Sequence, residues 1–467
     1  MFSNSLWNTL QPVNGLSPEI LSRIVQYVPG KNNIDARAIL LLTHVCRYWR
    51  ESIISAPEHW TLISSDSTDL TALSLGRSKA ALLEFRLRSY RIRDRPGFSD
   101  LIFPYLKNTK TLDFSDFLTI EEFRQRLPNF PQSMPNLRSL TLAPWLGGPD
   151  WDPFIDPFGS FPHTLRCLSL HYFPLYPSFL KLRTLTELTL RDYKFIFPMD
   201  TLLVIVEGNP SLERVSLSID FAEPSLRDSQ RRTVAKNQLR SLSISCLDAM
   251  DARALVSGIF LPRGAHLEIH LGRIGGLADI LAGLSMAHLA NLPLPTFMES
   301  RSSGRHIRLS GQNGSFSINS PTLPEVSFLE FPLLRLHNIR ELWLDSPTPK
   351  PWTPISFCLR FFHALTTLVI KHDVDTSNTL STLFSTPSSS PPLKTLAFLD
   401  CVITEDFMKR LIRFASDRKN ITQARLHRVV IAHRDGDLPS DDSVCDLEDH
   451  VPVVEVLVDT KLPTDLT

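Results

Sequence analysis

The sequence predicts an α/β protein in which a small N-terminal three-helix module is followed by an irregular repeat solenoid with one parallel β-sheet. Two observations lead to this fold class. Apolar residues at helical spacing occupy the first sixty positions or so, and a short Leu-x-x-Leu-x-Leu pattern recurs along most of the remaining chain. The 467 residues are too many for one compact core and are enough for a small module and a large one.

The first helix is expected to begin at Pro18. Ser17 is a good N-cap residue, and Pro at the first helical position loses no hydrogen bond because that N–H has no partner inside the helix. An apolar stripe follows at a spacing of three and four residues, made of Ile20, Leu21, Ile24, Val25 and Val28. Pro29-Gly30 is expected to end the helix.

Two more helices are expected before residue 60. Asp35 can cap the second helix, which carries Ile39, Leu40, Leu41 and Leu42. Thr43 can cap the third, which carries Val45, Cys46, Trp49 and Ile53 and ends at Pro57, with Trp60 behind it. Cys46 and Trp49 are best interpreted as core residues.

The repeat pattern gives the remainder of the chain its predicted architecture. Copies begin at residues 137, 165, 185, 212, 239, 339, 365 and 393, and a weak last copy spans Ile421–Leu426. Most steps are 26–28 residues, the period of units that contribute one strand and a helix or turn each. Such units bury their apolar faces only by stacking, so the copies predict adjacent parallel strands. In the copy at 393, Thr404 is expected to cap a helix.

Three segments depart from this rhythm. Leu82 to Arg95 begins with an alternating pattern that suits a half-buried strand, and its arginines are read as an exposed face balanced by acidic neighbours. Leu267–Leu271 looks like another strand, and 306–310 and 315–318 predict a hairpin joined by Asn-Gly, which is read as decoration of the sheet. The acidic segment 435–467 is expected to be partly loosely ordered.

The N-terminal residues resemble the F-box family. The resemblance covers residues 15–62 and rests on Leu16-Ser17-Pro18-Glu19, on Val45-Cys46-x-x-Trp49-Arg50 and on Pro57-x-x-Trp60. His59 stands where the family has Leu, and Val25 where it often has Phe. The N-terminal half looks like the large fungal group of F-box proteins with degenerate leucine-rich repeats. This gives a tail at 1–14, an F-box at 15–65, a leucine-rich-repeat-like solenoid at 66–434 and an acidic segment at 435–467.

The resemblance implies a substrate-recognition subunit of an SCF-type ubiquitin ligase, with no catalytic residues and no cofactor or metal. A Skp-family adaptor, and through it a cullin, would be the partner of the F-box, and the repeats would hold a target protein. The positions that match those building the module or touching the adaptor are Leu16, Pro18, Ile20, Leu21, Ile24, Val45, Trp49 and Trp60. The alternative is a repeat scaffold whose F-box does not serve degradation.

Composition agrees with a non-catalytic, intracellular protein. Lys plus Arg and Asp plus Glu both number 49, which removes the electrostatic argument for binding nucleic acid or a membrane surface. The 6 cysteines form no C-x-x-C pair, and scattered thiols suit the reducing cytoplasm or nucleus. We find no signal peptide, no span long enough for a bilayer, and no phosphate-binding, dinucleotide, zinc-protease or nucleophile-elbow motif.

The residues between the leucines of each copy are expected to point to the concave, partner-binding face of the solenoid. Trp343 stands out there, with Glu341, Asp345 and Lys371 as neighbours and Arg191 on an earlier copy. An exposed Trp between acidic residues fits a binding hot spot for a target. The alternative is that Trp343 packs beneath a loop or the nearby hairpin.

Overall fold

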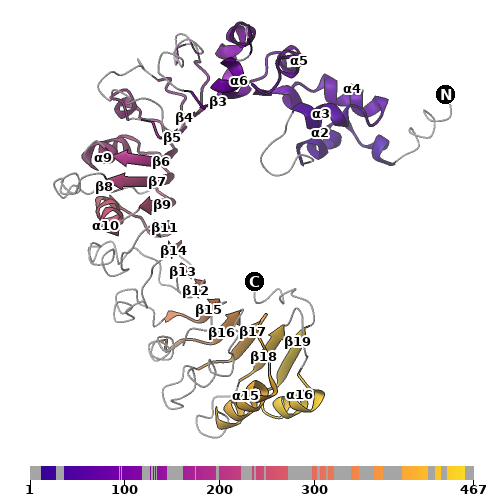
Figure 1. The fold of residues 1–467 in the computed structure, drawn as a ribbon, viewed down its shortest axis with the longest axis vertical. Helices are drawn as coiled ribbons and strands as arrows, with labels where there is room; N and C mark the ends of the chain where they lie inside the picture. The colour runs from indigo at the N-terminus through magenta and orange to yellow at the C-terminus, as the bar shows by residue number, and fades with distance from the viewer. Residues whose placement is uncertain are drawn as a thin grey trace. The chain divides into compact units, whose positions relative to one another are not determined.

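The computed structural model describes a mixed α/β protein whose contacts divide it into two units, 1–194 with 200–213 and 195–199 with 214–467 (Figure 1). The described residues are 12–27, 36–93, 95, 97–117, 127, 130, 132, 134–144, 161–173, 175–195, 199–221, 234–235, 238–246, 249–271, 297–301, 306–311, 314–319, 338–345, 362–371, 392–418, 426–432 and 439–457. Within them, no helix is long and apolar enough to cross a membrane.

The first unit begins with a helical module and continues into strands. Its helices are η1 (Pro12–Gly15), α2 (Pro18–Tyr27), α3 (Ala36–Leu42), α4 (Arg47–Ser55), η2 (Pro57–Trp60), α5 (Thr68–Ser78), α6 (Ser89–Arg93), α7 (Phe98–Ile102), η3 (Phe103–Asn108), η4 (Phe179–Lys181) and most of α9 (Met199–Gly208). Its strands are β1 (Leu62–Ser64), β2 (Leu83–Arg88), β3 (Thr109–Ser115), β4 (Ser139–Ala143), β5 (Cys167–His171) and most of β6 (Glu187–Phe195). Each strand is parallel to the next along the chain.

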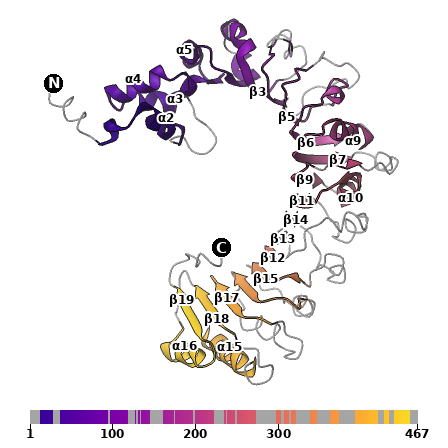
Figure 2. The same ribbon diagram turned by 180° about the vertical axis from the view of Figure 1, so that it is seen from behind.

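The second unit also consists mainly of parallel strands, and antiparallel pairing interrupts them at β13. Its strands are β7 (Arg214–Phe221), β8 (Val234–Ala235), β9 (Ser241–Cys246), β10 (Ile259–Phe260), β11 (His266–Leu271), β12 (Phe297–Arg301), β13 (His306–Gly311), β14 (Gly314–Asn319), β15 (Glu341–Asp345), β16 (Thr367–Lys371), β17 (Thr395–Leu399), β18 (Arg428–Ala432) and β19 (Val453–Leu457). Its helices are α10 (Ala249–Gly258), α15 (Glu405–Asp417) and α16 (Asp441–Glu448). Helices α15 and α16 lie on one side of strands β17–β19 (Figure 2).

The repeat pattern places the strands correctly. All eight strong copies form strands that start two residues after the first Leu or Ile of the pattern. The leucines inside these strands are buried, with Leu140, Leu168, Leu188, Leu242, Leu342 and Leu396 all at most 1% exposed. Thr404 caps α15, since its hydroxyl accepts a hydrogen bond from the Phe407 N–H over 3.1 Å.

The expectation of a purely parallel sheet is wrong between β11 and β15. The predicted hairpin exists as β13 and β14, but it is part of the sheet and not a decoration. Strand β14 pairs in parallel with β11, β12 pairs in parallel with β15, and β13 is antiparallel to both of its neighbours. Gly311 and Gly314 pair in register where β13 passes into β14.

Two further expectations concern the C-terminal part of the chain. The weak copy at Ile421–Leu426 lies almost entirely outside the described residues. The strand that follows it is β18, in which Val429, Val430 and Ile431 are buried, and Leu426 just before the strand is buried as well. The acidic segment contains α16 and β19, and β19 pairs in parallel with β18. The parallel pairing of strands therefore extends to residue 457, within the segment expected to be partly loosely ordered.

Candidate functional site

The N-terminal module has its own apolar core, contributed by α2, α3, α4 and η2. The core consists of Leu21, Val25, Ile39, Trp49, Ile53 and Trp60. Trp60 is 1% exposed, its indole N–H donates to the Ile53 carbonyl over 2.9 Å, and the Arg77 guanidinium lies 4.3 Å from its ring centroid. Leu21, Trp49 and Trp60, three of the residues predicted at the adaptor surface, therefore build the module from inside.

Other residues predicted there lie on the surface. Ile20 is 49% and Val45 is 55% exposed, Pro18 is also exposed, and Leu16 and Ile24 are partly exposed. Leu41, which the sequence reading placed with the apolar residues of the second helix, is 71% exposed. Three successive leucines on a seven-residue helix cannot all face one core. The run Leu40–Leu42 therefore indicates that at least one of these leucines is exposed.

The third helix begins later than expected. Its N-cap is Cys46 in extended conformation, while the Thr43 hydroxyl donates to the Leu40 carbonyl over 2.6 Å at the end of α3. Thr43 therefore acts as part of the turn that closes α3, and the prediction that it caps the next helix is wrong. As a result, Val45 lies in the connection between α3 and α4, which explains its exposure.

A polar contact joins the first helix to the short helix at residue 57. The Ser22 hydroxyl lies 2.9 Å from the Nε2 atom of His59, which is buried. Burial lowers the pKa of His59, and the nearby Glu58 carboxylate opposes this shift to a smaller extent. A neutral imidazole can share a hydrogen bond with Ser22 in either tautomer, so the two residues hold α2 against η2.

The strands of the first unit have one buried face and one polar face. The polar face, as named here, comprises Glu84, Arg86, Arg88, Thr111, Asp113, Ser115, Ser139, Thr141, Cys167, Ser169, His171, Glu187, Thr189 and Arg191. All of these side chains are partly or fully exposed. Burial between neighbouring strands raises the pKa of Asp113, and Arg86 and Arg88 partly offset that effect. This face offers charged groups and hydroxyls together.

Trp343 lies on the equivalent face of the second unit, but the expectation that it is exposed is wrong. It is 8% exposed and belongs to a buried group, the Trp343 cluster, made of Trp343, Val369, Ala397, Leu399, Val430 and Ala432. Its indole N–H donates to Glu341, and the Lys371 ammonium lies 4.4 Å from its ring centroid. Apolar residues at matching register positions on β16, β17 and β18 give Trp343 neighbours to pack against.

The predicted target-binding residues are thus only partly brought together. Glu341 and Lys371 are half-buried beside Trp343, and Asp345 pairs with Lys371 in backbone register while its side chain lies outside the described residues. Arg191 belongs to the first unit, where it is exposed on the polar face. The residues between successive leucines were expected on one accessible face, and the polar face of the first unit agrees with that, but the expected binding residues centred on Trp343 and not on the Ser and Thr residues of the first unit.

The described residues contain no group of three or more His, Cys, Asp or Glu side chains placed to hold a metal ion. Comparison with protein-family models and with curated proteins finds no match for the chain. The function is therefore argued from the residues themselves.

Proposed function

We propose that this protein is the substrate-recognition subunit of an SCF-type ubiquitin ligase, in which residues 15–65 act as an F-box that binds a Skp-family adaptor. The observation that carries the proposal is the N-terminal module, whose described residues form a buried core and still leave large apolar side chains in solvent. Ile20, Leu41 and Val45 account for three of the eight large apolar side chains that are exposed among the described residues. Exposed apolar side chains gathered in so short a segment favour a protein interface.

The adaptor would cover these side chains. Burying them stabilises a complex by about 1.5–3 kcal/mol for each side chain that is fully covered, before the cost of association is subtracted. The core tryptophans contribute indirectly, because Trp49 and Trp60 fix the positions of α4 and η2. The contribution of this chain to ubiquitin transfer would be proximity, since it would hold a target near the loaded enzyme.

The target is proposed to bind the polar face of the first unit, which includes Arg191. The burial of the Trp343 cluster leaves little of that tryptophan to contact a partner, whereas the polar face keeps its side chains accessible. Charged groups of both signs, such as Arg88 and Asp113, favour specific recognition through complementary charge. In this proposal the protein selects its target through complementary charge and not through a catalytic group.

The test uses the full chain co-expressed with a Skp-family adaptor. The Ile20→Asp, Leu41→Asp double variant should weaken co-purification by at least about a hundredfold, because an unpaired buried carboxylate costs several kcal/mol. Both residues are exposed in the free protein, so the variant should fold normally. Val402→Asp is the matched control, since Val402 is 47% exposed but lies beyond the module. Undiminished adaptor binding by the double variant would exclude the proposal.

The alternative function is a scaffold that binds the adaptor, or another protein, without directing degradation. It is separated from the first by measuring turnover of the co-purifying target. A target that accumulates when the adaptor is depleted supports the ligase, and a target whose half-life is unchanged supports the scaffold.

A further inference from the structure

Within the part of the chain that the structure describes, the last strand of the sheet has one edge with no strand beside it. Among the described residues, β19 pairs with β18 alone, whereas β15, β16, β17 and β18 each have a strand on both sides. The backbone N–H and C=O groups along such an edge can accept another extended chain.

The residues of β19 do not protect this edge. Its sequence is Val-Val-Glu-Val-Leu, without Pro or Lys, and its one charged residue, Glu455, is paired with Arg428 of the neighbouring strand. Val453 is 44% exposed and the other four residues are half-buried. In the preceding strand, by contrast, Val429, Val430 and Ile431 are fully buried. An added strand would complete the burial of β19 to the level of β18.

Charge beside the edge indicates what kind of chain would bind. Helix α16 packs against β19 and exposes acidic residues along its length and just after it, namely Asp441, Asp442, Asp446, Glu448 and Asp449. Residues 439–457 contain no Lys or Arg. The Arg428 guanidinium, which reaches this strand from β18, is already engaged by Glu455 at 2.9 and 3.0 Å. Helix α16 therefore carries a clear excess of negative charge next to the edge strand.

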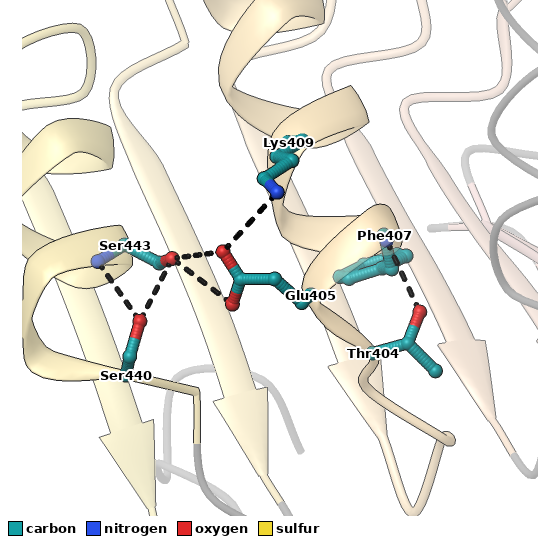
Figure 3. Close-up of polar contacts among 6 residues, drawn as sticks. All are labelled: Thr404, Glu405, Phe407, Lys409, Ser440 and Ser443. Atoms are coloured by element: carbon teal, nitrogen blue, oxygen red, sulfur yellow. Dashed lines mark hydrogen bonds and ion pairs between the residues drawn. The ribbon is translucent and has the colours of Figure 1, made fainter.

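Helix α16 is held in a defined position. The Ser443 hydroxyl donates to the Glu405 carboxylate of α15 over 3.2 Å, and Lys409 lies 4.0 Å from the same carboxylate (Figure 3). Ser440 caps α16 by accepting the Ser443 N–H over 3.3 Å. These contacts join α16 to Glu405 of α15, while Asp441, Asp442, Asp446 and Glu448 of α16 are exposed. The negative charge is thus fixed beside the β19 edge.

We propose that the free edge of β19 is a docking site for an extended, basic segment of a partner protein, which adds to the sheet as the next strand. The segment would carry apolar residues at alternate positions, to cover the half-buried valines, and Lys or Arg at the others, to pair with the α16 carboxylates. A second copy of this chain fits less well, because symmetric pairing of two β19 edges brings two acidic α16 helices together. The site uses none of the residues proposed for adaptor or target binding.

The test uses fluorescence anisotropy to measure how tightly the full chain binds a labelled peptide. In the basic peptide Lys and Val alternate, and in the acidic comparison peptide Glu and Val alternate. The basic peptide should bind and the acidic peptide should not. The Asp442→Lys, Asp446→Lys variant should weaken binding of the basic peptide about tenfold, as expected for the loss and reversal of surface ion pairs. The Asp69→Lys, Asp100→Lys variant, which makes the same charge change on exposed residues of α5 and α7, should bind as the parent does.

Hydrogen exchange distinguishes pairing at the edge from attraction by charge alone. In the free protein, the β19 amides that do not bond to β18 should exchange rapidly, and the basic peptide should slow them. Protection of every β19 amide before the peptide is added would mean that another segment of this chain or a second copy already occupies the edge, and would overturn the proposal. Peptide binding without added protection in β19, or equal effects of the two charge variants, would overturn it as well.

Discussion

The strands of the first unit and the last strands of the second unit are alike in having leucines at the same positions. They differ in the residues that alternate with those leucines along each strand. Leu112, Leu140 and Leu168 in the first unit and Leu342, Leu368 and Leu396 in the second are all buried. The residue between the two apolar positions of each strand is polar in the first region, as in Thr141 and Ser169, and apolar in the second, as in Val369 and Ala397. The leucines thus form the repeat, and the residue between them decides whether the second face is exposed or buried.

The largest difference between the two regions is expected for removal of the biggest side chain. Trp343→Ala should lower the free energy of unfolding by about 3–5 kcal/mol, because it empties the Trp343 cluster. Thr189→Ala on the polar face should change it by less than about 0.5 kcal/mol. Chemical denaturation of the full chain, monitored by far-UV circular dichroism, measures both effects without relying on tryptophan fluorescence. Similar effects at the two positions would contradict the contrast between the two faces.

A smaller difference in stability between the two regions is expected when a buried Val is replaced by Thr in one and a Thr of the polar face is replaced by Val in the other. Val369→Thr should lower the free energy of unfolding by about 1–3 kcal/mol. Val369 is fully buried, so the new hydroxyl would lose its hydration without gaining a hydrogen-bond partner. Thr141→Val, in the matching position of the first unit, should be close to neutral because Thr141 is partly exposed. Thermal melts of the two variants give the comparison, and a costly Thr141→Val would show that the polar face is covered.

The smallest difference is expected for one ion pair from each region. Arg428 and Glu455 have side chains 19% and 31% exposed and contact each other twice, whereas Lys110 and Glu84 are 43% and 39% exposed at 3.6 Å. Glu455→Gln should cost about 1 kcal/mol and Glu84→Gln only a few tenths. Unfolding measured at low and high salt provides the check, since screening should reduce the second effect more completely. Equal costs would remove this part of the contrast.

The fold was more predictable than the surfaces, for a physical reason. Strand positions follow from the spacing of buried leucines, which is local in the sequence, and this placed β4, β5, β16 and β17 correctly. The three-strand interruption was only half predicted, because the Asn-Gly turn reveals a hairpin but not which strands it joins. The copy expected at Ile421–Leu426 lies almost entirely outside the described residues and stays a prediction, whereas β18 at Arg428–Ala432 was not predicted from the sequence.

The exposure of single residues depended on neighbours that are distant along the chain. Trp343 looked like a surface hot spot while its own strand was read alone, and it becomes a core residue beside Val369 and Val430 from the next strands. In the N-terminal module, the predicted helix stripe was right for Leu21 and Val25, but Ile20 on its border faces solvent. Whether a border position is core or interface is decided by packing between helices and not by periodicity.

The interruption at β12–β14 has a consequence for how the second unit folds. Most strands pair with the next repeat, so short loops close and each pairing can form early. At the interruption, β14 returns to β11 and β12 reaches forward to β15, so two pairings span long stretches of chain with β13 between them. Loop closure is slower there, and we expect the strands on either side to fold first and the three-strand segment to join them last. Pulsed hydrogen-exchange labelling during refolding would then show late protection in residues 297–319.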